Sequence, residues 1–211
     1  VFFLRFEVGL FTPGTFMMGW VGTTALAASA LAGQLTHVTF MVPLGIGQAA
    51  SVRVGIAAGA RDPAGVGRAG WSALGLGAAS MAIAALLYLT IPEQLLNLFL
   101  DPSDPDNSEV LVLGVAFLTV AAFFQIADGT QVVGSSILRG LSDTRWPMIY
   151  SAFGYWAVGC LSAYLLAFHF DFGGVGIWIG WALGLSTTAL LLLYRFSRRE
   201  DLRLLEKVHA S

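Results

Sequence analysis

The chain has 211 residues, of which 56% are hydrophobic and only 11% are charged, and its mean hydropathy is +0.75. Soluble domains carry about 25% charged residues, so too little polar surface remains here to coat a soluble globule. The net charge of -2, without a basic patch outside the loops, gives no reason to expect a nucleic-acid partner, and the single cysteine, Cys160, excludes a disulfide or a multi-thiolate metal site built from these residues alone.

Long apolar runs separated by charged or Gly/Pro-rich breaks dominate the sequence. About 20 helical residues are needed to cross roughly 30 Å of hydrocarbon, and the runs reach that length. They are too long and too uniform for the alternating pattern of a membrane β-barrel. The expected fold class is therefore all-α, a polytopic membrane helix bundle of six transmembrane helices. The six spans are expected at about 1–21, 24–56, 67–91, 110–138, 148–168 and 174–194, followed by a tail at 195–211.

The two ends of the chain carry separate signals. Val1 opens directly into apolar sequence, without the basic segment and cleavage site of a signal peptide, and we expect an upstream part of the protein to precede it. The segment 195–209 alternates basic, acidic and leucine residues. It is consistent with a helix along the membrane surface or with a solvated helical tail.

The basic residues predict an orientation. They cluster around the second connection, the fourth connection and the tail, whereas acidic residues occupy the third and the fifth. With six spans, every basic connection and the C-terminus fall on one side, which the positive-inside rule makes cytoplasmic. A multi-pass protein of the bacterial inner membrane with a cytoplasmic C-terminus is expected. The residues behind this assignment are Arg53, Arg61, Arg68, Arg139, Arg145, Arg195, Arg198, Arg199, Arg203 and Lys207 on the basic side, and Glu93, Asp101, Asp104, Asp106, Glu109 and Asp171 on the acidic side.

Asp128 is the main candidate for chemistry. It lies roughly 16 Å from Arg139 and roughly 28 Å from Glu109 along a helix, at 1.5 Å per residue, which places it near the middle of the bilayer. A carboxylate at that depth is costly, so it usually faces a cavity or a partner and often binds a proton or a cation. The alternative is an aspartate that only hydrogen-bonds neighbouring helices as packing glue.

Other polar residues are weaker candidates. Glu7 could be a second intramembrane carboxylate or an interfacial acid near Arg5. Gln125 and Gln131 make the helix of Asp128 unusually polar at depth. His37 and its neighbour Gln34 lie in the second span, where hydrogen bonding within the bundle is the plainer explanation.

Enzymatic motifs are missing from the sequence. It contains no Walker-type phosphate loop, no metal-spaced cluster of His, Cys and Glu, and no GxSxG motif. The sequence therefore predicts no enzyme, no cofactor and no ATP-driven transport by this chain alone.

Two long strings carry a family resemblance. MVPLGIGQAASVRVGIAAGARD at 41–62 and ADGTQVVGSSILRGLSDTRWP at 127–147 resemble the C-terminal half of multidrug and toxic compound extrusion (MATE) transporters of the NorM type, as does FEVGLF at 6–11. The resemblance implies one six-helix lobe of a twelve-helix transporter. It also implies secondary active efflux of organic, mostly cationic compounds by antiport with H+ or Na+, through alternating access.

The resemblance also assigns residue roles. Asp128 and Glu7 match the acidic positions of the C-terminal lobe that are associated with proton or cation coupling, and they would ligate a metal ion only if that ion is Na+. Several sodium-coupled members carry a tyrosine one turn before the aspartate, where this chain has Phe124, which lacks the hydroxyl. Phe11 and Met41 are candidate cavity-lining residues, for which lipid-facing packing is the alternative.

Two other functions compete with drug efflux. A lipid-linked precursor flippase of the same superfamily would need cationic cavity residues for its pyrophosphate, and no intramembrane Lys or Arg other than Arg5 is visible. A non-transporting membrane scaffold would tolerate a neutral residue in place of Asp128. The expected partners are the lipid bilayer, small organic cations, and a missing N-terminal lobe in the same chain or in a second chain.

Overall fold

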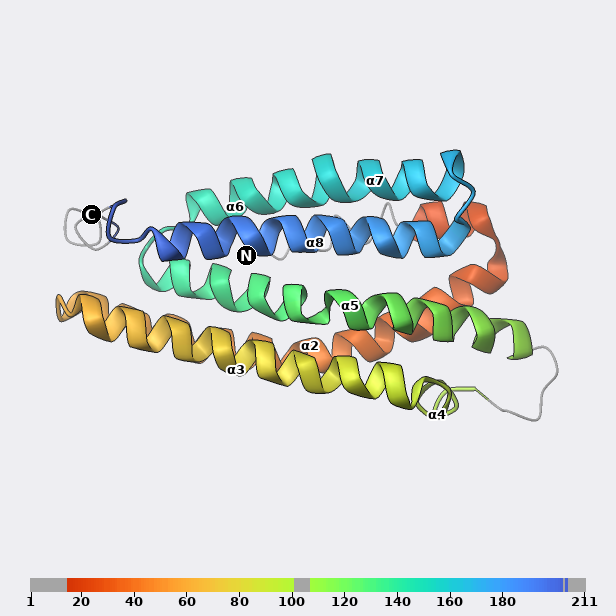
Figure 1. Cartoon of the computed structure of the whole chain (residues 1–211), viewed down its shortest axis with the longest axis horizontal. Coiled ribbons are helices and arrows are strands. Elements are labelled where there is room, and N and C mark those ends of the chain that lie inside the picture. Colours follow the sequence, from red (N-terminus) through yellow and green to blue (C-terminus); the bar gives the residue numbers. More distant parts are fainter. Residues whose placement is uncertain (1–14, 101–106, 203, 205–211) are drawn as a thin grey trace.

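The computed structural model describes residues 15–100, 107–202 and 204. Within these residues every regular element is helical, which confirms the expected all-α class (Figure 1). Residues 15–21 form a helical segment. The elements that follow are α2 (Thr23–Gly59), α3 (Pro63–Thr90), α4 (Pro92–Leu96), α5 (Asn107–Gly140), α6 (Arg145–Ala152), η1 (Phe153–Cys160), α7 (Leu161–Tyr164), η2 (Leu165–His169) and α8 (Gly173–Ser197).

Five helical stretches in the described residues are long and apolar enough to cross a membrane. They are Thr23–Gly59, Pro63–Thr90, Asn107–Gly140, Arg145–His169 and Gly173–Ser197. These stretches contain the second to sixth expected spans, except that Pro63–Thr90 ends one residue before the expected limit of 91. The first expected span, at 1–21, lies mostly outside the described residues.

Local chemistry explains where these helices begin and end. Arg61 and Ser142 adopt φ values of 56° and 58°, the left-handed conformation that commonly ends a helix, directly after α2 and α5. The Asp62 side chain then caps α3 by accepting a 2.8 Å hydrogen bond from the Gly65 backbone N–H. Proline at the first position of α3 fits the same start signal, because its missing N–H would have no partner there.

The Arg145–His169 span differs from the single regular helix expected at 148–168. It combines the short α-helices α6 and α7 with the π-helical segments η1 and η2. Gly154 and Gly159 lie in η1 against α8, where Gly154 approaches the backbone of Gly184 closely. Small residues permit this close helix contact, and π-helical turns change which side chains face the neighbouring helix.

Two other local features differ from the sequence-based expectations. The short helix α4 follows α3 directly, because Pro92 breaks the long helix and provides a favourable first position for a new one. At the other end α8 stops at Ser197, residues 198–202 form turns, and Leu204 is helical again. The remainder of the expected tail, apart from Leu204, lies outside the described residues.

The helix α5 is the centre of the bundle. It packs against α2 and α3 on one side and α8 on the other, and the Arg145–His169 span covers the far side of α8 (Figure 1). Every residue from Asp128 to Leu138 is buried, so this half of α5 is enclosed on all sides. The arrangement positions the Asp128 carboxylate inside the helix bundle.

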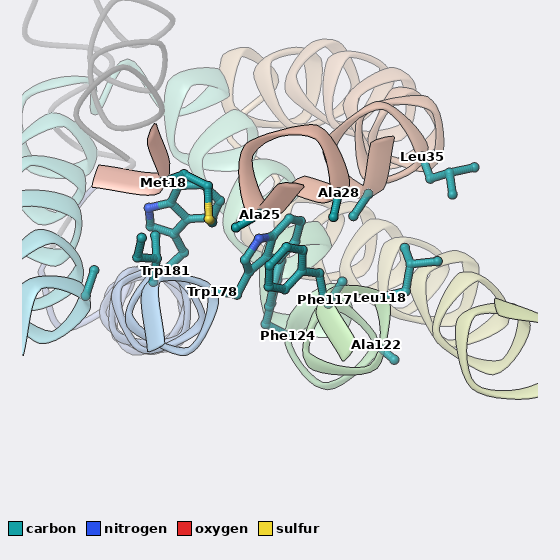
Figure 2. Packing of buried hydrophobic residues seen from close by; sticks show 14 of the residues in the cluster. Met18, Ala25, Ala28, Leu35, Phe117, Leu118, Ala122, Phe124, Trp178 and Trp181 are labelled. Carbon is teal, nitrogen blue, oxygen red and sulfur yellow. The ribbon is translucent and has the colours of Figure 1, made fainter. Parts of the chain in front are cut away.

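Two hydrophobic clusters form the core. The aromatic cluster surrounds Phe117, Phe124, Trp178 and Trp181, and it also takes in small residues of α2 such as Ala28 (Figure 2). The aliphatic cluster lies along the other half of α5. It is built mainly from aliphatic side chains of α2, α3, α5 and α8, including Val54, Val66, Val133, Ile137, Leu138 and Leu192.

Candidate functional site

A cavity of about 430 Å³ lies between α2, α5, α8 and the Arg145–His169 span. Its volume is within the range of small-molecule sites in proteins. Most of the lining is apolar. The polar side chains that reach it are Thr15, Ser29, Gln34, Thr36, His37, Asp128 and Tyr155.

Asp128 brings the only carboxylate to the described lining of this cavity, and the described lining contains no Lys or Arg. Its residue is 9% exposed, and Phe124 lines the cavity one helical turn earlier on the same face of α5. A carboxylate in such surroundings is stabilised by a bound proton or cation, since burial penalises its charged form.

An aromatic wall stands beside this carboxylate. The Trp178 ring stacks on Phe117 with 5.6 Å between ring centroids and tilts against Phe124 at 6.1 Å. Trp181 lies 5.3 Å from Trp178 on the next turn of α8 (Figure 2). The Trp178 indole N–H donates to the Ser29 Oγ of α2 at 3.3 Å. Contacts from α5 and from α2 therefore both fix the orientation of this ring. Electron-rich ring faces near a carboxylate are a suitable environment for an organic cation.

Two glutamines of α5 lie behind the cavity surface rather than in its lining. The Gln125 amide donates through Nε2 to Thr39 Oγ1 at 3.0 Å, and Thr39 Oγ1 is 2.8 Å from the Tyr88 hydroxyl. This chain of contacts connects α5 with α2 and α3. On the other side, the Gln131 amide donates to the Tyr155 hydroxyl, whose ring lines the cavity.

The structure brings most of the sequence-predicted residues together. Gln34, His37 and Met41 line the cavity from α2, and Phe124 and Asp128 line it from α5. Gln125 and Gln131 support the same region from behind. Glu7 and Phe11 lie outside the described residues.

Sequence reasoning missed the contribution of α8 and the Arg145–His169 span. Trp178 and Trp181 are three residues apart, a spacing that puts both on one helix face, and this was the available signal. The helix α8 is apolar on all sides, however, so its sequence does not show which of its faces meets a cavity. Tyr155 was equally hidden, because it lies in the π-helical segment η1.

The described residues contain no group of three or more His, Cys, Asp or Glu side chains that could hold a metal ion. An ion at this cavity would therefore have Asp128 as its only acidic ligand from the described residues. Neutral oxygen atoms would have to supply the rest of the ligand set.

Known proteins match both the sequence and the fold. The sequence profile of the MatE family matches residues 4–165. A probable multidrug resistance protein NorM from Mesorhizobium japonicum is 50% identical over 197 residues, which cover 93% of this chain and 42% of that protein. The multidrug resistance protein NorM of Burkholderia vietnamiensis is 47% identical, with 90% of this chain and 41% of that protein covered.

A solved structure gives the same picture for the fold. A MOP superfamily transporter from Pyrococcus furiosus superposes with a TM-score of 0.80 at 20% identity, covering 94% of this chain and 42% of that one. The chain thus spans about two fifths of the length of the relatives it matches. With a family match over most of its residues and the helical architecture of these transporters, the chain belongs to the MatE family, that is, the multidrug and toxic compound extrusion transporters.

Proposed function

We propose that this chain forms the C-terminal lobe of a multidrug efflux transporter that exchanges organic cations for H+ or Na+ by alternating access. The observation that carries the proposal is the Asp128 carboxylate, 9% exposed, in a cavity whose described lining has no Lys or Arg. The names of the NorM relatives support multidrug resistance as the role of the whole protein.

Substrate recognition follows from the cavity walls. Apolar and aromatic side chains favour amphiphilic molecules, and the rings of Phe124, Trp178 and Trp181 attract positive charge through their faces. The polar side chains that reach the cavity are a minority of its lining. The cavity therefore suits a class of organic cations rather than a single metabolite.

Coupling follows from competition at one carboxylate. Asp128 can be neutralised by a proton, by an inorganic cation or by the organic cation, and binding of one weakens binding of the others. A small ion that enters from outside and binds Asp128 favours release of the organic cation, provided that the ion and the substrate prefer different conformations of the transporter. Glu7 is proposed as a second carboxylate of the site, and the N-terminal lobe as the opposite wall of the pathway.

The orientation proposed from the sequence fits this direction of transport. The connections around Arg61 and Arg145 and the tail after Ser197 are placed in the cytoplasm of a bacterial cell, in an inner-membrane protein. The third connection, which carries the acidic residues between α4 and α5, is then placed outside.

The flippase alternative is disfavoured by charge. A pyrophosphate-bearing lipid needs Lys or Arg in the cavity, and the described lining has a carboxylate instead. The scaffold alternative makes a different prediction, namely that a neutral residue at position 128 changes no flux.

The proposed function is tested by Asp128→Asn in the full-length transporter that carries this lobe, reconstituted in proteoliposomes. Ion-stimulated exchange of a fluorescent organic cation is expected to be abolished while the thermal unfolding midpoint stays close to that of the unaltered protein. Asp171→Asn is the matched control: it removes an exposed carboxylate with the same change of charge, and its backbone φ of 56° is one that Asn tolerates. Undiminished exchange in Asp128→Asn would show that the coupling site lies elsewhere.

A further inference from the structure

Two buried glutamines flank Asp128 symmetrically along α5. Gln125 lies three residues before it and Gln131 three residues after it, and both are 0% exposed. Three residues correspond to about 4.5 Å of rise along a helix and to neighbouring positions on its surface. Asp128 thus has one amide group within a helical turn on each side.

Both amides are anchored by their nitrogen atoms. The Gln125 Nε2 donates to Thr39 Oγ1, which is itself hydrogen-bonded with the Tyr88 hydroxyl, and the Gln131 Nε2 donates to the Tyr155 hydroxyl. The carbonyl oxygens, Oε1 of each residue, are buried and have no hydrogen-bond partner among the described residues. Buried polar atoms are normally satisfied, so these two acceptors call for a ligand.

The chemistry of the missing ligand can be narrowed. An amide oxygen only accepts, and it must therefore meet a donor or a positive charge. One proton on Asp128 would provide a single donor, which cannot satisfy two separate carbonyl oxygens. A hard cation can bind a carboxylate and several neutral oxygens together, and glutamine carbonyls are among its usual ligands.

We infer that Gln125 and Gln131 are ion-selectivity residues, whose carbonyl oxygens join Asp128 in binding a dehydrated alkali cation, Na+. The inference rests on the proposed function, because it makes the same carboxylate the coupling site. Phe124 has no hydroxyl, so it supplies no oxygen at the position where several sodium-coupled members of the family carry a tyrosine. In this chain amide oxygens from the same helix α5 take that role.

The test compares two driving ions in the full-length transporter in proteoliposomes. Na+ binding to the purified protein is measured by calorimetry, and efflux of a fluorescent organic cation is driven separately by a Na+ gradient and by a pH gradient. Gln125→Met and Gln131→Met keep the length of the side chain but remove the carbonyl oxygen together with the Nε2 donor to Thr39 or Tyr155. Each is expected to weaken Na+ binding by about 10- to 100-fold and to reduce efflux driven by a Na+ gradient much more than efflux driven by the pH gradient.

Two further variants keep the test decisive. Ser135→Ala is the matched control on α5, because it removes a buried oxygen that bonds only its own helix, at Val132 O, and it should leave Na+ binding unchanged. Gln131→Glu keeps an oxygen at the same reach and should retain Na+ binding even if a methionine variant folds poorly.

The possible failures are distinguishable. Equal losses of Na+-driven and proton-driven efflux in the methionine variants would assign the glutamines a structural role and overturn the inference. So would a pH gradient that drives efflux in the unaltered transporter where a Na+ gradient does not, although the proposed function would then stand. Efflux driven by neither gradient would reject the proposed function itself.

Discussion

The aromatic cluster and the aliphatic cluster lie along opposite halves of α5, and they enclose that helix differently. Before Asp128 the helix keeps an exposed face, with Val112 68% and Phe123 78% exposed, whereas from Asp128 to Leu138 every residue is buried. The aromatic cluster borders the cavity through Phe124, Trp178 and Trp181. None of the residues of the aliphatic cluster's buried core lines it.

Two aspartates near these clusters lie in different surroundings. Asp128 faces the cavity, whereas Asp143, in the turn after α5, is paired with Arg195 of α8 at 2.5 Å. The Arg195 guanidinium also lies 5.0 Å from the centre of the Trp146 ring. One region of the lobe thus contains a cavity lined by a carboxylate and aromatic rings, and the other contains a buried ion pair between two elements.

The largest effect on stability is expected from breaking the buried ion pair between Asp143 and Arg195. Arg195→Met leaves the Asp143 carboxylate buried without its cation, since the two side chains are only 7% and 10% exposed. Removing one partner of a buried pair typically costs about 3–5 kcal/mol. Chemical unfolding in detergent should show a loss of this size, while transport per folded molecule is retained because the pair lies away from the cavity lining.

Arg198→Met is the matched control for this prediction. Arg198 pairs with Asp201 at 2.7 Å, but their side chains are 54% and 65% exposed. Solvent screens exposed pairs strongly, so Arg198→Met should cause little loss of stability. If both arginine variants lose the same free energy of unfolding, the buried Asp143–Arg195 pair stabilises the fold no more than an exposed pair does.

A smaller effect is expected from forcing two spans apart. A Cβ atom on Gly180 of α8 would lie 2.3 Å from the Ala163 backbone N, a contact that only a backbone shift can relieve. Gly180→Ala should therefore destabilise the protein by about 1–3 kcal/mol, and it should disturb the cavity as well, because Tyr155 is carried by the displaced span.

Gly75→Ala on α3 provides the comparison for Gly180→Ala. A Cβ atom there meets none of the described atoms within 4 Å. Gly75→Ala should not lower the free energy of unfolding, because alanine favours a helix over glycine by up to about 1 kcal/mol and the added methyl group meets open space. Alanine favours a helix over glycine, so similar losses from both substitutions would mean that the close approach of the spans at Gly180 does not set the result.

The sequence predicted the five long helical stretches of the described residues well, because the hydrocarbon thickness imposes a minimum length on every apolar run. It also predicted that Asp128 lies inside a long apolar span, and the structure has Asp128 within α5, 9% exposed. Which face of a helix meets a cavity is a different matter. Gln125 and Gln131 were candidates by polarity alone, and the structure places them behind the cavity surface, hydrogen-bonded to Thr39 and Tyr155.

The same limit explains the missed aromatic residues. In a soluble helix, the boundary between apolar and polar faces shows which side packs inward. In α8 both sides are apolar, because one meets protein and the other meets lipid. The inward direction of Trp178 is fixed by contacts with Phe117 and Ser29, and both residues are more than 60 positions away in the sequence.

The smallest effect is expected inside the aromatic cluster itself. Ser29→Ala removes the acceptor of the Trp178 indole N–H, a long bond of 3.3 Å. The ring remains fixed by Phe117, Phe124 and Trp181, so its orientation toward the cavity should hardly change. The bond contributes about 0.5–1 kcal/mol, so the affinity for an organic cation should weaken by no more than two- to fivefold, measurable by quenching of tryptophan fluorescence. Ser80→Ala, which removes a hydroxyl bonded only to Gly77 O of its own helix, should leave that affinity unchanged. A tenfold or larger loss of affinity in Ser29→Ala would mean that the bond to α2, rather than packing within the aromatic cluster, fixes Trp178 in the cavity wall.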